Sequence, residues 1–136
     1  MMNSRRAQAL LAAALTDAEE KGVAVSVAVV DSAGFLKAFG REDGAGAYTV
    51  DVAIGKAYAV IFMARPSAAV RDLAEARPQF FGAIKDLGMR TLIPSPGGVE
   101  VPGGAIGVSG AANPDEDVAI AMAAIGQVDA TIKESG

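Results

Sequence analysis

The chain has 136 residues, a length typical of one domain that buries about two thirds of the surface of its unfolded form. Its formal net charge is -4, and Lys and Arg are not clustered beyond Arg5-Arg6, which argues against nucleic acid as a partner. The absence of Cys and His excludes a disulfide framework, a thiol nucleophile and the commonest metal ligand. We therefore expect a single domain over residues 1–136 with no metal site.

The N-terminal segment is predicted to be an amphipathic helix from Ser4 to Glu20, ended by Gly22. Arg5-Arg6 before an Ala/Leu run imitates a signal peptide, but polar residues follow at once without a convincing cleavage site. No stretch reaches the roughly 18 apolar residues that a membrane span needs. We therefore expect a cytoplasmic protein without a membrane partner. The residues expected to cover the sheet are Leu11, Ala14, Leu15 and Ala18.

A β-hairpin is predicted next, with strands from Val23 to Val30 and from Phe35 to Phe39. Asp31 and Gly34 occupy the first and last places of a four-residue turn between them. The segment from Tyr48 to Met63 is apolar nearly all round, which is typical of a helix buried on more than one side. Two shorter helical pieces should follow, over Ser67–Ala76 and Pro78–Leu87.

The Gly- and Pro-rich segment from Thr91 to Gly110 is expected to form two or three short strands joined by turns. The last helix should begin at Pro114, with Asn113 as its cap. This order favours an α+β fold, with an antiparallel sheet of about five strands flanked by helices. The predicted core-facing stripe of the last helix is Val118, Ala121, Met122, Ile125 and Ile132.

Several motifs, in this order along the chain, are similar to the pattern of the GlcG/HbpS family over about Val23 to Ala124. Each motif alone is weak, whereas five in register are fairly specific. They are Val29-Val30-Asp31 with Gly34, Arg41-Glu42-Asp43-Gly44-Ala45, Ala53-Ile54-Gly55-Lys56-Ala57, Pro96-Gly97-Gly98-Val99, and Ala105 to Gly110 with Asp115 to Ala119.

The resemblance implies a profilin-like fold, homo-oligomeric assembly and a bacterial source. Members of the family include haem-binding proteins and the C-terminal domain of PduO-type corrinoid adenosyltransferases, and many have no assigned activity, so the family indicates the fold better than the function. The chain departs from the pattern where Glu100 follows Pro96-Gly97-Gly98-Val99 and where the segment before Gly104 is shortened.

Lys56 is the first candidate catalytic residue, because no acidic residue lies three or four positions away on its helix. One interpretation is a lysine that extends its ammonium group to water along its alkyl stem. The other is an amine at a pocket wall that binds an anion or acts as an acid or base. Its place in the Lys56-Ala57 pair of the family motif favours the second interpretation.

Arg41 and Asp43 are the other two catalytic candidates. Either they form a surface ion pair, or Arg41 offers its planar guanidinium to a carboxylate while Asp43 orients it or serves as general base. Asp31 is interpreted as a turn residue.

Four further residues are candidates for ligand binding: Gly97, Gly98, Ser109 and Tyr48. Glycines permit a close approach of backbone N–H groups to an anion, although turn and bulge geometry explains them equally well. Haem iron is usually bound by His, Cys, Met or Tyr, and only Met and Tyr are present here. The composition therefore disfavours haem, and no cofactor is predicted.

The sequence thus favours a homo-oligomeric protein that binds a small anionic organic molecule. Its enzymatic form would be proton-transfer chemistry, as in an isomerase or tautomerase, or lyase chemistry on an oxo or hydroxy acid, with Lys56 and Arg41 holding the anion and Asp43 as base. The alternatives are an accessory protein that binds haem or a corrinoid without catalysis, and a purely structural oligomer.

Overall fold

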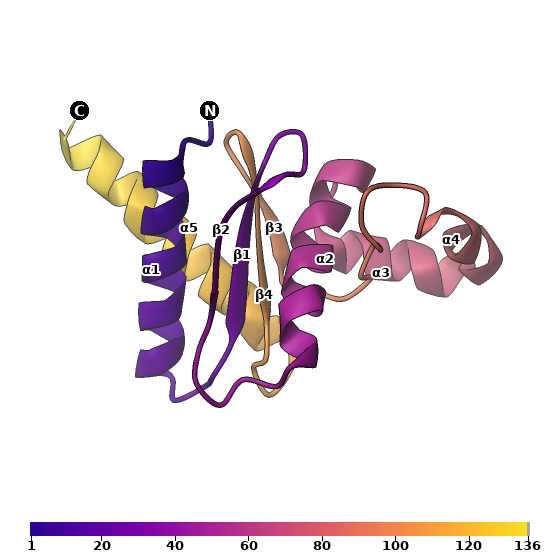
Figure 1. Cartoon of the computed structure of the whole chain (residues 1–136), viewed down its shortest axis with the longest axis horizontal. Helices are drawn as coiled ribbons and strands as arrows, with labels where there is room; N and C mark the ends of the chain where they lie inside the picture. The colour runs from indigo at the N-terminus through magenta and orange to yellow at the C-terminus, as the bar shows by residue number, and fades with distance from the viewer. Residues whose placement is uncertain (136) are drawn as a thin grey trace.

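The computed structural model describes residues 1–135, with side chains described for residues 1–129. The fold is α+β, with five helices and four strands over these residues (Figure 1). In chain order the elements are α1 (Ser4–Glu20), β1 (Ser26–Asp31), β2 (Leu36–Arg41), α2 (Tyr48–Met63), α3 (Ser67–Ala76), α4 (Pro78–Ile84), β3 (Gly98–Val101), β4 (Gly104–Ser109) and α5 (Pro114–Ser135).

The four strands form one antiparallel sheet in the order β2-β1-β4-β3. The predicted turn after β1 is confirmed, because the Gly34 N–H donates to the Asp31 backbone oxygen at 2.9 Å and Gly34 has a φ of +88°. Asp31 Oδ1 accepts hydrogen bonds from the N–H groups of Ala33 and Phe35, each at 3.0 Å. Asp31 is therefore the turn residue that the sequence indicated.

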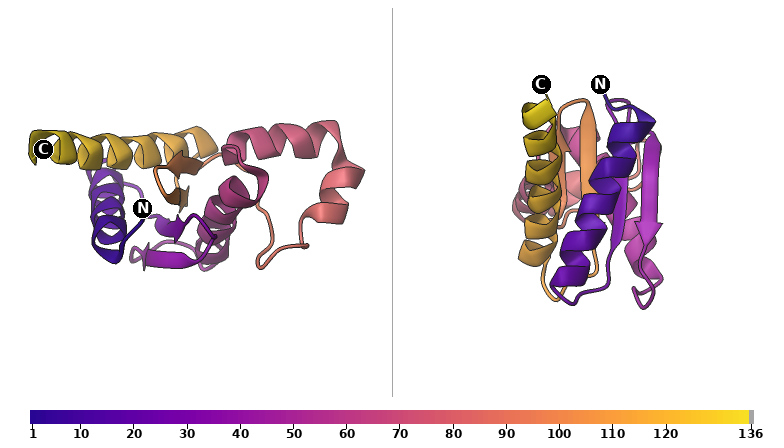
Figure 2. Two further views of the ribbon diagram at one scale, coloured as in Figure 1. Left: turned by 90° about the horizontal axis from the view of Figure 1, so that it is seen from above. Right: turned by 90° about the vertical axis from the view of Figure 1, so that its left-hand side faces the viewer.

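The sheet is covered by helices on both faces (Figures 1 and 2). Side chains alternate along β1, so that Val27 and Val29 pack in the cluster with α1 and α5, whereas Ala28 and Val30 pack against α2. Small residues on the α2 side allow close packing: a Cβ at Gly107 would collide with the backbone of α2. The central helix α2 is thereby held directly on the sheet.

The helices α3 and α4 and the segment after them extend beyond α2, away from the sheet (Figure 2). Their core is small and is formed largely by Tyr58, Val70, Phe81 and Leu92.

Among the helices of the described residues, none is long and apolar enough to cross a membrane.

The described sheet has four strands where about five were expected, because residues 91–97 form an irregular segment. Pro94 and Pro96 lack the N–H group that a strand ladder requires, and this accounts for the missing strand. The first strand begins at Ser26 rather than Val23, and the predicted helix to Leu87 ends at Ile84.

The start of α5 follows the prediction, since Asn113 Oδ1 accepts the Glu116 N–H at 3.0 Å. The predicted core-facing stripe is correct for Ala121, which is buried, but wrong for Met122, which is half exposed on the outer side of the helix. Ile132 of that stripe lies outside the described side chains.

Candidate functional site

The loop of residues 85–93 lies along α2 and is fixed to it at its centre. The Met89 N–H donates to the Tyr58 hydroxyl at 3.0 Å, and Tyr58 itself is buried in α2. The Leu92 N–H donates to the Lys85 backbone oxygen at 2.9 Å, while the Leu92 side chain is buried in the core beside α3 and α4. These contacts hold the loop in one position relative to the helix.

Gly55 determines how closely α2 and this loop approach each other. A Cβ at this position would collide with the Ile93 side chain and would lie 2.9 Å from the Thr91 backbone oxygen. Beside this contact lies a crevice of about 380 Å³, within the range of about 300–1,000 Å³ typical of small-ligand sites. Its lining residues are Asp51, Ile54, Gly55, Met89, Arg90, Thr91 and Ile93.

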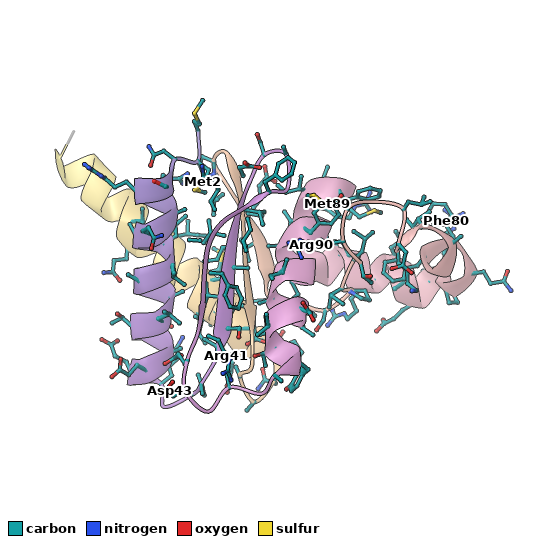
Figure 3. The ribbon with its side chains drawn as sticks, viewed as in Figure 1. Met2, Arg41, Asp43, Phe80, Met89 and Arg90 are labelled. Carbon is teal, nitrogen blue, oxygen red and sulfur yellow. The ribbon has the colours of Figure 1, made fainter. Side chains whose placement is uncertain are left out.

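The crevice carries two opposite charges that do not neutralise each other. Asp51 comes from the first turn of α2, and Arg90 comes from the loop, where Figure 3 shows it next to Met89. Over the side chains of residues 1–129, no ion pair or side-chain hydrogen bond involves either residue. Because a guanidinium is charged at every physiological pH, Arg90 is available to an anionic group of a ligand.

A buried ion pair joins α2, β4 and α5 in the interior. Lys56 is only 2% exposed, and its Nζ lies 3.1 Å from Asp117 Oδ2 and 2.9 Å from the Val108 backbone oxygen. Asp117 Oδ1 also accepts the Ala111 N–H at 3.0 Å. The interpretation of Lys56 as a lysine that extends to water is therefore wrong.

Burial dominates the electrostatics of this pair. Burial lowers the pKa of Lys56 below 10.5, and the nearby Asp117 carboxylate opposes that change. Burial likewise raises the pKa of Asp117 above 3.8, with Lys56 and the Ala111 N–H acting in the opposite direction. Such mutual perturbation is found at catalytic sites and in structural ion pairs alike.

Two of the predicted ligand-binding glycines pack against Lys56, Gly97 against its ammonium group and Gly98 against its backbone. Gly97 has a φ of +130°, and a Cβ there would lie 2.9 Å from Lys56 Nζ. The Gly98 N–H donates to Ser67 Oγ at 2.7 Å. Both glycines and Ser109 are buried. The backbone at Gly97 and Gly98 is therefore engaged within the protein, and ligand binding by these residues stays a prediction.

Arg41 is the last residue of β2 and Asp43 lies in the connection to α2, at the edge of the molecule (Figure 3). The Arg41 guanidinium donates to the Ala45 backbone oxygen at 2.8 Å, and no ion pair joins it to Asp43 in the described part of the chain. Tyr48, at the start of α2, is 69% exposed. These three residues are accessible to solvent.

The three predicted catalytic residues are thus distributed between the interior and the surface. Lys56 is buried, whereas Arg41 and Asp43 are exposed, and no hydrogen bond or ion pair between any two of them is found among the side chains of residues 1–129. Asp117 was not predicted as the partner of Lys56, because helical spacing points only to residues on the same helix. Arg90 was not predicted either, because its only signal was a cation in a loop two residues after Gly88.

Metal and haem ligands are sparse. No group of three or more His, Cys, Asp or Glu side chains suited to a metal ion occurs among the described residues. Of the Met and Tyr residues that composition left for haem, Tyr58 is buried, whereas Met89 is 50% exposed at the crevice.

The family model described as "Haem degrading protein HbpS-like" matches residues 2–126 of the chain. No curated protein shows significant sequence similarity to the chain.

Solved structures with the same fold cover most of the chain. Klebsiella pneumoniae protein ORFY is 25% identical, with a TM-score of 0.84 and coverage of 95% of this chain and 91% of that one. A double mutant of Streptomyces reticuli HbpS is 29% identical, with a TM-score of 0.79 and coverage of 92% and 85%. The PduOC:haem complex is 24% identical, with a TM-score of 0.80 and coverage of 92% and 93%, which shows likeness of fold alone.

Proposed function

The chain belongs to the HbpS-like family, and on this premise we propose that it binds a small organic molecule with an anionic group in the crevice between α2 and residues 89–93. The observation that carries the proposal is the Arg90 guanidinium, which lines this crevice and has no ion-pair partner among the described side chains. Ile54 and Ile93 add apolar walls.

A guanidinium suits this role because its planar donors match a carboxylate in two parallel hydrogen bonds. Hydrogen bonds to charged groups contribute about 1.5–3 kcal/mol each to stability or binding, which corresponds to roughly tenfold or more in affinity. The fixed position of the loop on Tyr58 and Gly55 reduces the entropy lost when a ligand binds. A free cation on a fixed loop beside apolar walls is therefore suited to a small carboxylate.

The test is calorimetric titration with a panel of small carboxylates, namely lactate, pyruvate, alanine and oxaloacetate. Arg90→Gln should weaken binding of those that bind the native protein by about tenfold or more. Arg5→Gln is the matched control, since Arg5 is an exposed arginine on α1, on the other face of the sheet. Equal affinities for the native protein and Arg90→Gln would contradict the proposal.

A competing candidate is an enzyme that performs proton transfer or lyase chemistry on an oxo or hydroxy acid, with Lys56, Arg41 and Asp43 in the predicted roles, at a site separate from the crevice of Arg90. Lys56 would have to leave Asp117 to reach a substrate, because its ammonium group is buried. Deuterium incorporation at the carbon beside the substrate carbonyl, followed by NMR in deuterated water, tests this chemistry. Asp43→Asn should slow the exchange, and an unchanged rate would contradict the role of Asp43 as base.

The second candidate is haem binding without catalysis, which the family description and one structural observation support. Met89 lies half exposed beside Arg90 in the crevice, so that a thioether for iron and a cation for a propionate are adjacent. Titration with haemin should then show a saturable Soret shift at one site per chain, which Met89→Leu removes. Broad, superstoichiometric adsorption would contradict this candidate.

Homo-oligomeric assembly belongs to the same proposal and rests on the family resemblance. Light scattering after size-exclusion chromatography should give a mass above the 13.7 kDa of one chain, and a monomer mass at all concentrations would contradict it.

A further inference from the structure

Asp51 and Arg90 line the same crevice and carry opposite charges, yet they do not form an ion pair. Asp51 is exposed, and the lysine of its own helix, Lys56, is buried against Asp117. Within the described part of the chain, the Asp51 carboxylate has no side-chain hydrogen bond either. Both charges are therefore available to a ligand in the crevice.

The backbones that carry Asp51 and Arg90 belong to elements that are fixed relative to each other. Asp51 belongs to the first turn of α2, whereas the loop of Arg90 is held by the hydrogen bond from Met89 to Tyr58. One residue further along, Thr91 Oγ1 donates to Asp86 Oδ1 at 2.6 Å. The first bond fixes the loop backbone on α2 and the second braces the loop internally, so the backbone positions that carry Asp51 and Arg90 are held in place when a ligand binds between the two side chains.

Resting on the proposed function, we propose that Asp51 sets the specificity of the crevice for carboxylates that also carry a hydrogen-bond donor, either a hydroxyl or an ammonium group. The ligand carboxylate lies against Arg90, and its donor group donates to Asp51. An ionised carboxylate only accepts hydrogen bonds, so an oxo group in place of the donor would leave Asp51 facing a second acceptor. The site then discriminates against oxo acids of the same size.

Asp51 also has an alternative, structural role that involves no ligand, because the helix dipole favours a carboxylate in the first turn of α2. That role alone predicts a change in the stability of the protein on substitution of Asp51 and no change in ligand preference. The preference between two ligands of equal size is thus the quantity that separates the two roles.

The experiment compares lactate, alanine and pyruvate, which differ in the group beside the carboxylate, by calorimetric titration. The native protein should bind lactate or alanine about tenfold more tightly than pyruvate. The tighter-binding ligand of lactate and alanine shows whether the donor that Asp51 accepts is a hydroxyl or an ammonium group. Asp51→Asn, whose amide can also donate, should bring the affinities within about threefold of each other. Asp72→Asn, an exposed acid on α3, should leave the native preference unchanged.

The outcomes distinguish this inference from the proposed function. A preference that survives in Asp51→Asn, or equal native affinities for the three ligands, would overturn the specificity role even where Arg90→Gln abolishes binding. Binding that is unaffected by Arg90→Gln would overturn the proposed site itself. Failure of all three ligands to bind the native protein would overturn both.

Discussion

Replacing Lys56 with methionine should destabilise the protein strongly, although a lysine is normally a surface residue. The substitution leaves the Asp117 carboxylate buried, with a side chain only 6% exposed, and removes the hydrogen bond to the Val108 backbone oxygen. Removal of one partner of a buried ion pair typically costs about 3–5 kcal/mol. Asp117 keeps the Ala111 N–H and can take up a proton, so we expect about 3 kcal/mol, near the lower end.

Urea denaturation followed by far-ultraviolet circular dichroism measures this loss, and thermal unfolding should show a fall in Tm of about 10 °C. In the double variant Lys56→Met/Asp117→Leu most of the stability should return, because replacing a whole buried pair by apolar residues is often nearly neutral. Lys21→Met is the matched control. Its ion pair with Asp17 is at the surface and contributes about 1 kcal/mol or less.

A native-like free energy of unfolding for Lys56→Met would refute the reasoning. That result would be expected of a lysine that acts only on a substrate. Equal destabilisation in the single and the double variant would also refute it, because the penalty would then come from lost packing rather than from an unpaired charge.

Three further predictions concern the elements around the site. Gly97→Ala should lower the free energy of unfolding by about 1–3 kcal/mol in the same urea experiment, because its φ is +130° and the new methyl group would crowd Lys56 Nζ. Asn113→Ala should cost about 1 kcal/mol through loss of the α5 cap, and no change would mean that water replaces the cap. Hydrogen bonds from Lys85 and Thr91 lower the pKa of Asp86 in the folded protein below its ordinary value of 3.8. The ionised Asp86 therefore stabilises the loop fully above pH 3.8, and this stabilisation is lost as the pH falls through the pKa of the folded protein. The Arg90 amide signal in NMR should report this transition, and Asp86→Asn should lack it.

Local patterns predicted most of the fold. The helix from Tyr48 to Met63 has the same bounds in sequence and structure, because Gly46 and Pro66 bracket a continuous apolar segment. The turn at Asp31 and the cap at Asn113 depend on side chains that bond to their own neighbouring backbone, so the sequence contains all the information they need.

The arrangement of the site required contacts between distant segments. Asp117 pairs with Lys56 from 61 positions away, and helical spacing gives no sign of such a partner. Arg90 gained its place only because Gly55 lets the loop lie against α2 and Tyr58 holds it there. The missing fifth strand could have been foreseen, since Pro94 and Pro96 cannot donate to a ladder.

The most direct test of the proposed site is NMR mapping of a bound carboxylate on isotope-labelled protein. With lactate or alanine as probe, our account predicts saturable shifts confined to amides of residues 51–55 and 89–93, which Arg90→Gln abolishes. Shifts centred instead on residues 41–48, around Arg41 and Tyr48, or along α1 would contradict it.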